Sequence, residues 1–354
     1  MSLLRPGGTF GDFEVLKELG RGGMGAVYLV RDPETDERYA AKVMLESPLH
    51  GDDFQRRFIR EAEIAMAVDH PNLVKVYDVG RDPETGLAYM IMDYVGGGDL
   101  HEALARRLIE RRGPYRVKET LAVIRPLLGA LSAASAAGVV HRDIKPDNIL
   151  FDDEGNPLLT DLGVAKLSDE QTLTRLTMSN VVVGTPAYMS PEQMTDSHKV
   201  DVRSDLYSLG LVLWEMLAGE CPNAELSAAE LMSRALKGTR IRDIRTLRPK
   251  LPPYVLRFLR RMTDPKPERR FATPDEALHF LDEWKAQEER KFRTFLTATA
   301  VLSSLLIATI LVIGIGWIRR PSSVSVSAAS EAPSGPRSEP EAEDSEFSIP
   351  ESVK

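Results

Sequence analysis

A short polar stretch at residues 141–148, HRDIKPDN, places a carboxylate, an ammonium group and an amide within a few positions. Asp143, Lys145 and Asn148 supply these three groups, and Arg142 adds a second cation directly before the carboxylate. A reaction at one charged group of a substrate would account for so many polar side chains in so few positions. A turn before a strand is the structural alternative, because His, Asp, Pro and Asn all suit turns.

A glycine-rich motif near the N-terminus could hold phosphates. Gly20, Gly22 and Gly25 form G-x-G-x-x-G, and the strand-like residues Ala-Val-Tyr-Leu-Val follow at once. In a dinucleotide-binding fold the same glycines open a helix. Here the motif predicts a loop between two antiparallel strands, with its backbone able to lie over phosphates; a purely structural glycine turn is the alternative. The loop is not a P-loop, since no Gly-Lys-Ser/Thr follows.

Two charged residues lie in apolar surroundings and are expected to pair. Lys42 lies in the strand-like run YAAKVML, where a lone lysine is rarely comfortable. Residues 53–68 are predicted to form a helix, and Glu61 falls on its apolar face with Phe58 and Ala65. Because a buried charge is costly unless it is paired, the sequence predicts an ion pair between Lys42 and Glu61. A glutamate at the edge of the apolar face is the alternative.

The elements that must position these residues change in type along the chain. The first ninety residues are rich in β-branched and aromatic runs separated by turn residues, which predicts strands. The pentapeptide RDPET occurs at 31–35 and 81–85, and both copies read as hairpin connections between strand-like runs. From residue 99 onward helical patterns dominate. The predicted fold class is α+β, with a small β-rich lobe followed by a larger helical lobe.

Composition narrows the function classes. Of the 354 residues, 43% are hydrophobic and 28% are charged, which is a normal globular mixture. The net charge of −8 argues against broad nucleic-acid binding, because no strong basic field is present to neutralise phosphates. Cys221 is the single cysteine, so no internal disulfide can form, and we expect a buried thiol in a reducing compartment.

One segment near the C-terminus differs from the rest. Residues 294–318 contain no charge, and this run exceeds the roughly 20 residues that a membrane-spanning helix needs. Flanking Lys and Arg residues and Trp317 fit a span; a buried core helix is the alternative. The expected organisation is an N-terminal extension at 1–12, a globular domain at 13–284, a juxtamembrane linker at 285–293, a transmembrane helix at 294–318 and a disordered acidic Ser/Pro-rich tail at 319–354.

Together these motifs resemble the signature set of protein kinases. The glycine-rich loop, the Ala-Ala-Lys42 strand, Glu61, the polar stretch, Asp161-Leu-Gly and Ser-Pro-Glu192 come in the order of that set. The resemblance covers residues 13–284 and is most apparent to the eukaryotic-like serine/threonine kinases of bacteria. It implies a two-lobed kinase fold that transfers the γ-phosphate of ATP to protein hydroxyls. Asp-Leu-Gly departs from Asp-Phe-Gly, and Tyr-Ala-Ala from Val-Ala-Ile before Lys42, but neither change removes a charge.

The resemblance implies a role for each chemical group. Asp143 orients the acceptor hydroxyl and takes its proton, and Lys145 neutralises charge on the transferring phosphate. Asn148 and Asp161 hold the metal, Mg²⁺ or Mn²⁺, while Lys42, fixed by its glutamate partner, holds the α- and β-phosphates. The implied ATP-binding residues are Leu19, Gly20, Gly22, Gly25, Val27, Ala40, Lys42, Met92, Asp93 and Val95.

The same resemblance assigns three residues to support. Glu192 and Arg270 match the pair that braces the large lobe, and Asp205 matches the residue that supports the catalytic loop from a buried helix. The lysine two residues after the catalytic aspartate, together with Thr185, resembles the serine/threonine-specific pattern.

Control is implied at the activation segment, residues 161–192. In kinases of this pattern an arginine placed like Arg142 pairs with a phosphate on that segment. Thr177 and Ser179 are the expected phosphorylated residues, with Thr172 and Thr174 as weaker candidates. Modification in trans implies a homodimer. The alternative is that these hydroxyls only solvate a loop.

The expected partners are proteins with Ser/Thr acceptors and one membrane span, and no nucleic acid. We expect a single-pass protein of the cell membrane with its kinase domain in the cytoplasm, because ATP is there. A non-catalytic scaffold of the same fold is the alternative function, but it would need a missing catalytic group. A receptor that works through an outer domain is disfavoured, because the low-complexity tail is too short to fold as one.

Overall fold

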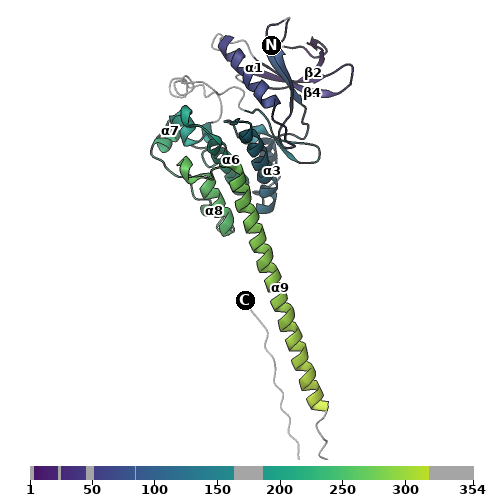
Figure 1. The fold of residues 1–354 in the computed structure, drawn as a ribbon, viewed down its shortest axis with the longest axis vertical. Coiled ribbons are helices and arrows are strands. Elements are labelled where there is room, and N and C mark those ends of the chain that lie inside the picture. The colour runs from purple at the N-terminus through teal and green to yellow at the C-terminus, as the bar shows by residue number, and fades with distance from the viewer. Residues whose placement is uncertain (1–3, 23–24, 45–51, 84, 163–185, 319–354) are drawn as a thin grey trace, which may run out of the picture. The chain divides into compact units, whose positions relative to one another are not determined.

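The computed structural model describes residues 4–22, 25–44, 52–83, 85–162 and 186–318. The chain divides into two compact units, Met1–Arg290 and Lys291–Lys354. The first unit has a β-rich small lobe followed by a helical large lobe (Figure 1). The predicted α+β class with two lobes is therefore confirmed.

The small lobe is built on a six-stranded antiparallel sheet in the order β1-β2-β3-β4-β6-β5. One helix, α1 (Asp52–Met66), contacts β5 and β6, close to the bounds predicted for it. The strands are β1 (Thr9–Phe10), β2 (Phe13–Arg21), β3 (Gly25–Arg31), β4 (Arg38–Met44), β5 (Val76–Arg81) and β6 (Ala88–Asp93).

Strand β4 is apolar on both of its faces. Ala41 and Val43 belong to one apolar cluster, whereas Ala40 and Met44 belong to a second cluster that continues into the large lobe. Because successive residues of a strand point to opposite faces, Lys42 shares the face of Ala40 and Met44. This position explains why a charged residue interrupts an otherwise apolar strand, since the face leads toward the large lobe.

The two RDPET copies are hairpin connections, as predicted. The first joins β3 to β4 and the second joins β5 to β6. In each copy the aspartate accepts a hydrogen bond from the backbone of its own turn, from Glu34 to Asp32 at 2.8 Å and from Thr85 to Asp82 at 2.8 Å. Local turn chemistry therefore accounts for the repeat, and no larger duplicated unit is needed.

The large lobe packs its helices around α6, which is mostly apolar and buried along most of its length. Trp214 of this helix is fully buried. Cys221, which follows α6, is partly buried, and loss of water around the thiol raises its pKa. The elements are α2 (Leu100–Ile109), α3 (Val117–Ala136), β7 (Ile149–Phe151), β8 (Pro157–Leu159), α5 (Pro191–Thr195), α6 (Val202–Ala218), α7 (Ala228–Leu236), α8 (Pro253–Met262) and α9 (Pro274–Ile318).

Helix α9 is continuous through the expected linker and the whole charge-free run to Ile318. Apolar side chains on it are exposed, for example Leu302 at 66% and Ile307 at 59%. Among the residues that the structure describes, no helix meets the combination of length and apolarity that crossing a membrane requires. The predicted span is thus not confirmed and stays a prediction. The expected tail, residues 319–354, lies outside the described residues.

Candidate active site

The short hairpin of β7 and β8 brings the two predicted metal ligands together. Ile149 at the start of β7 pairs with Leu159 at the end of β8. Beyond that pair, the backbone N–H of Thr160 donates to the carbonyl of Asn148 at 3.0 Å. Because the strands are antiparallel, the residue before β7 lies beside the residues that follow β8. Asn148 and Asp161 are therefore held at the same end of one hairpin.

Asn148 is tied to Asp143 within the polar stretch. The side-chain amide nitrogen of Asn148 donates to the carbonyl oxygen of Asp143 at 2.7 Å and lies 3.2 Å from its carboxylate. These two bonds use the amide nitrogen, so the amide oxygen of Asn148 keeps its capacity to accept. The ammonium of Lys145 lies 3.8 Å from the same carboxylate. The three groups singled out in the sequence thus form one cluster.

The cluster rests on a buried histidine. His141 is fully buried, and its Nδ1 accepts from the backbone N–H of Asp143 at 3.2 Å. Its Nε2 lies 2.8 Å from the carbonyl oxygen of Thr160, to which it must donate because Nδ1 is the acceptor. The neutral imidazole therefore couples the polar stretch to the end of β8. The sequence motif contained this histidine, but its spacing alone did not reveal that role.

Asp205 holds the same stretch from α6, as expected for the residue that supports the loop. Its carboxylate accepts from the backbone N–H groups of His141 at 2.8 Å and Arg142 at 2.7 Å. Burial raises the pKa of Asp205 to about 7, against the lowering effect of these two bonds. Arg142 has a φ of 64°, in the left-handed region. The buried carboxylate thus helps to hold a backbone turn that a non-glycine residue seldom adopts.

Lys42 reaches across to the large lobe. Its ammonium lies 2.7 Å from the Asp161 carboxylate, and both side chains are largely shielded from solvent. The expected partner, Glu61, has a side chain that lies outside the described residues, so the Lys42–Glu61 pair stays a prediction. Sequence reasoning missed Asp161 as a partner of Lys42 because the two residues come from different lobes and no local spacing links them.

The glycine-rich loop joins two antiparallel strands, as predicted, because Gly20 lies near the end of β2 and Gly25 begins β3. A Cβ at Gly20 or Gly22 would meet open space, whereas one at Gly25 would lie 2.5 Å from the carbonyl oxygen of Val43. Gly25 is therefore required by the close approach of β4. The open side of Gly20 and Gly22 is compatible with a ligand over the loop.

The predicted adenine-binding residues gather on one side of the sheet. Ala40 and Met92 are paired directly across β4 and β6, and both belong to the second apolar cluster, against which Val27 and Val95 pack.

The Asp93 carboxylate accepts from the Tyr77 hydroxyl at 2.7 Å, a bond that is the main reason why the pKa of Tyr77 rises to about 12. Leu19 is 39% exposed at the edge of this region.

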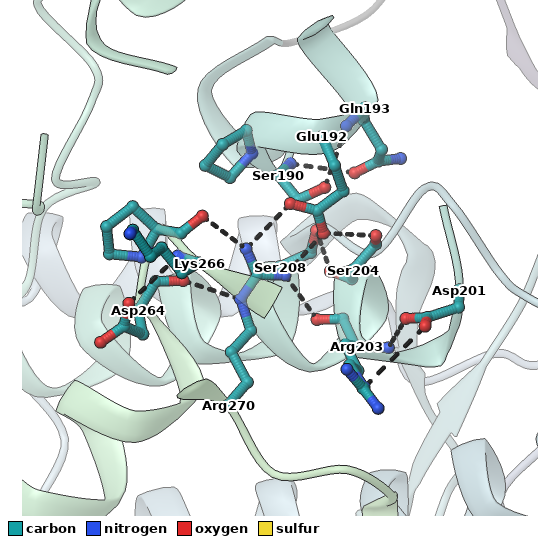
Figure 2. A network of polar contacts seen from close by, with 12 residues as sticks. Ser190, Glu192, Gln193, Asp201, Arg203, Ser204, Ser208, Asp264, Lys266 and Arg270 are labelled. Atoms are coloured by element: carbon teal, nitrogen blue, oxygen red, sulfur yellow. Dashed lines mark hydrogen bonds and ion pairs between the residues drawn. The ribbon is translucent and has the colours of Figure 1, made fainter. Parts of the chain in front are cut away.

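A buried ion pair anchors the end of the activation segment. Figure 2 shows the Glu192 carboxylate facing the Arg270 guanidinium, with two contacts of 2.6 and 2.9 Å. Arg270 also donates to the carbonyl oxygens of Asp264 at 2.7 Å and Arg203 at 2.8 Å. Burial raises the pKa of Glu192, but the Arg270 bonds outweigh it and hold the pKa below its ordinary value. The bracing pair expected from the sequence is therefore present.

Gln193 connects this anchor to the polar stretch. Its side-chain nitrogen donates to the carbonyl oxygen of Arg142 at 2.7 Å. Its side-chain oxygen accepts from the backbone of Ser190, and Ser190 in turn caps the first turn of α5. Gln193 was not among the residues predicted from the sequence; its signal was the capping-box pattern of Ser190 followed by Gln193.

The described residues offer two oxygen ligands to a divalent cation, the Asn148 amide and the Asp161 carboxylate. No group of three or more His, Cys, Asp or Glu side chains in the described part of the chain is arranged to hold a metal. Such a pair suits Mg²⁺, which keeps several waters and usually shares its coordination with substrate phosphates. The predicted phosphosites Thr177 and Ser179, and also Thr172 and Thr174, lie outside the described residues.

Comparison with known proteins agrees with this arrangement. Residues 13–281 match the family described as Protein kinase domain. The chain is 35% identical over 266 residues to Serine/threonine-protein kinase PrkC of Bacillus subtilis, covering 75% of this chain and 39% of that protein. It is 33% identical over 297 residues to Serine/threonine-protein kinase pkn3 of Myxococcus xanthus, covering 81% of this chain and 53% of that one.

A crystal structure of the Mycobacterium tuberculosis PknI kinase domain superposes with a TM-score of 0.61 at 30% identity. The superposition covers 80% of this chain and 99% of that domain. The chain spans about half or less of the length of the curated relatives named above.

Proposed function

Because the chain belongs to the protein kinase family, we propose that it transfers the γ-phosphate of ATP to serine and threonine hydroxyls of proteins. The observation that carries this proposal is the cluster of Asp143, Lys145 and Asn148 beside the Lys42–Asp161 pair. Each of these groups has a task in phosphoryl transfer, which asks a protein mainly to position groups and to neutralise charge.

Asp143 acts on the acceptor hydroxyl in this account. Its backbone is held by His141 and its carboxylate lies near the Asn148 amide, so it is fixed where it can orient the hydroxyl and accept its proton. The ammonium of Lys145, close to the same carboxylate, neutralises charge on the phosphate that moves between donor and acceptor. Lys42 meets the α- and β-phosphates of ATP from the small lobe.

A divalent cation fits the donor set of the site. The Asn148 amide oxygen and the Asp161 carboxylate would hold it, and the bound cation would neutralise charge on the phosphate oxygens. The family implies ATP and a divalent metal; Mg²⁺ is our proposal on the grounds of its preference for oxygen ligands, with Mn²⁺ as the substitute. Lys42 shares Asp161 with this cation, so nucleotide and metal would bind next to each other.

Specificity for serine and threonine is supported by the names of the relatives, which are serine/threonine kinases. A catalytically silent scaffold of the same fold is the second candidate. The groups that the reaction requires at positions 42, 143, 148 and 161 are all present, which favours the enzyme. The test is to incubate the purified chain with γ-labelled ATP, Mg²⁺ and a general acceptor protein. Label on phosphoserine and phosphothreonine supports the enzyme, and no label above background contradicts it.

We also propose that the chain is anchored in the cell membrane by residues 294–318, with its kinase domain in the cytoplasm. The support is the charge-free run in the sequence and the exposed aliphatic side chains on α9, such as Leu305 and Ile310. We expect the full chain to resist extraction from membranes by carbonate and by high salt. A protein consisting of residues 1–290 alone should be released under the same conditions. Full release of the intact chain by salt would refute the anchor.

Autophosphorylation in trans, within a homodimer, is the proposed route of activation. Its support is the position of Arg142 directly before Asp143 and the hydroxyls at Thr177 and Ser179 in the sequence. A phosphate on either hydroxyl would carry roughly two negative charges, and a guanidinium can bind it with bidentate hydrogen bonds.

A further inference from the structure

The large lobe contains a hollow that takes no part in the proposed catalytic cluster. It has a volume of about 520 Å³ and lies between α6, residues 240–244, α8 and residues 263–269. That volume is in the range of sites for small ligands or for a few side chains of a peptide. Apolar residues line part of it, of which Ile241 and Leu256 are half-buried and Trp214, Ile244 and Leu259 are buried.

Arginines dominate the remaining lining. The lining contains six arginines and two aspartates, a formal excess of four positive charges. The chain as a whole has a net charge of −8. Charge of one sign in a hollow with apolar walls attracts ions of the opposite sign. We call this site the arginine hollow; its arginines are Arg240, Arg242, Arg257, Arg260, Arg261 and Arg269.

The chain's own carboxylates meet only part of this charge. Arg240 pairs with Asp264 and Arg260 with Asp243, while Arg242 and Arg261 pair with glutamates outside the hollow. In the described parts of the chain, no ion pair engages the remaining two arginines, Arg257 on α8 and Arg269 before Arg270. They come from separate elements and both line the hollow, and the Arg257 guanidinium also lies 5.0 Å from the centre of the Trp284 ring.

We propose that the arginine hollow docks a phosphorylated serine or threonine of a partner protein, with a neighbouring apolar side chain against the half-buried Ile241 and Leu256. A phosphate ester carries about two charges and three acceptor oxygens, which suits several guanidinium groups better than a single carboxylate. The apolar wall beside the arginines favours a peptide over free phosphate, since a peptide also buries apolar area. The inference rests on the proposed function for the source of phosphorylated proteins, while docking itself needs no catalysis.

The hollow adjoins the anchor of the activation segment. Asp264 lies in its wall, and Figure 2 shows the carbonyl oxygen of Asp264 bonded to the Arg270 guanidinium, at 2.7 Å. A docked segment would therefore lie in the large lobe, held by residues separate from the catalytic cluster. Through this site the enzyme would retain a substrate that already bears one phosphate and modify it again.

The test is direct binding to the full chain carrying Asp143→Asn, so that the outcome does not depend on turnover. The probe is a fluorescein-labelled peptide pool with phosphothreonine at its centre and randomised flanking residues, read by polarisation at physiological salt. We expect Arg257→Ala with Arg269→Ala to weaken binding at least tenfold, and Lys at both positions to recover only part of it, because lysine lacks the bidentate fork. The matched control removes two exposed small-lobe arginines, Arg38 and Arg56, and should bind like the parent.

Four outcomes would overturn the proposal. The first is absence of binding above the unphosphorylated pool. The second is equal binding of a pool with glutamate in place of phosphothreonine, which would indicate docking of acidic segments in general. In the third, the double variant loses binding to phosphatidylserine vesicles but the peptide pool does not bind, which assigns the hollow to a membrane surface. The fourth is equal loss in the control variant. Thermal unfolding of each variant checks that the fold is retained.

Discussion

The ammonium of Lys42 lies 2.7 Å from the carboxylate of Asp161 and joins a strand of the small lobe to the end of β8 in the large lobe. Asp161 has a φ of 63°, so a residue in a seldom-used backbone conformation presents its carboxylate to this lysine. The pair therefore places the Lys42 ammonium, which is predicted to bind phosphate, next to the Asp161 carboxylate, which is predicted to bind the metal. ATP and its metal would therefore bind between the lobes with both groups already close.

Replacing Lys42 by Met should remove most phosphoryl transfer while the fold is kept. The loss expected is several kcal/mol of transition-state stabilisation, roughly what one preorganised charged donor contributes elsewhere. The rate of label transfer from ATP measures it, and Lys17→Met, the same change at an exposed site on β2, is the control. Near-normal turnover of the Lys42→Met variant would show that Lys42 has no part in phosphoryl transfer.

Replacing Asp205 by Asn should lower kcat more than it changes the KM for the acceptor, because Asp205 holds the backbone of the polar stretch and not the acceptor. An amide offers one oxygen to the two N–H groups of His141 and Arg142 that the carboxylate now satisfies, and one unsatisfied buried donor costs about 1–3 kcal/mol. A selective rise in KM with kcat unchanged would contradict this role.

Comparison of the wild type with Asp205→Asn should also reveal a pH dependence of the free energy of unfolding. The pKa of Asp205 is raised from 3.8 to about 7, so between these values the folded chain holds a proton that the unfolded chain has lost. The wild-type free energy of unfolding should therefore fall relative to that of Asp205→Asn as the pH rises from about 4 to 7. Urea unfolding of both proteins across that range checks the sign, and a difference that does not change with pH would show that Asp205 is ionised in the folded chain throughout.

Breaking the Glu192–Arg270 pair should destabilise the large lobe. Glu192→Gln leaves the buried guanidinium without its counter-charge, which costs about 3–5 kcal/mol, whereas Glu283→Gln in an exposed pair with His279 should cost less than about 1 kcal/mol. Since the pKa of Glu192 is lowered, its contribution is present above the ordinary glutamate pKa and is lost as the pH falls. Equal destabilisation by the two substitutions in denaturant titrations at pH 7 would contradict the account.

Changing both Thr177 and Ser179 to Ala should lower phosphorylation of a protein acceptor far more than it weakens ATP binding. The physical reason is that the phosphates that Arg142 would meet could no longer form. Mass spectrometry of the active enzyme should find one or both sites modified, and Thr172→Ala with Thr174→Ala serves as the control. Unmodified sites in fully active enzyme would count against this mechanism.

Local patterns predicted the parts of this molecule whose cause is local. The strands of the small lobe, α1 and the two Asp-Pro hairpins follow from periodicity and turn residues, and the polar stretch at 141–148 was evident from its composition. The buried helix that carries Asp205 was implied by the family resemblance. The Lys42–Asp161 contact, the His141 bridge to Thr160 and the Gln193 bond to Arg142 join distant segments. No spacing along one sequence encodes such pairs. The arginine hollow was missed for the same reason, because its charges come from several elements.

The most direct test of the central claim compares Asp143→Asn with Asp147→Asn in transfer of the γ-phosphate of ATP to a protein acceptor. Both changes neutralise a carboxylate in the same loop, but Asp147 is exposed, whereas Asp143 lies with Lys145 and Asn148. The account predicts a loss of roughly 10²–10⁴-fold for Asp143→Asn, the range for a general base, and near wild-type transfer for Asp147→Asn. Equal activity of the two variants, or retained transfer in Asp143→Asn, would contradict it.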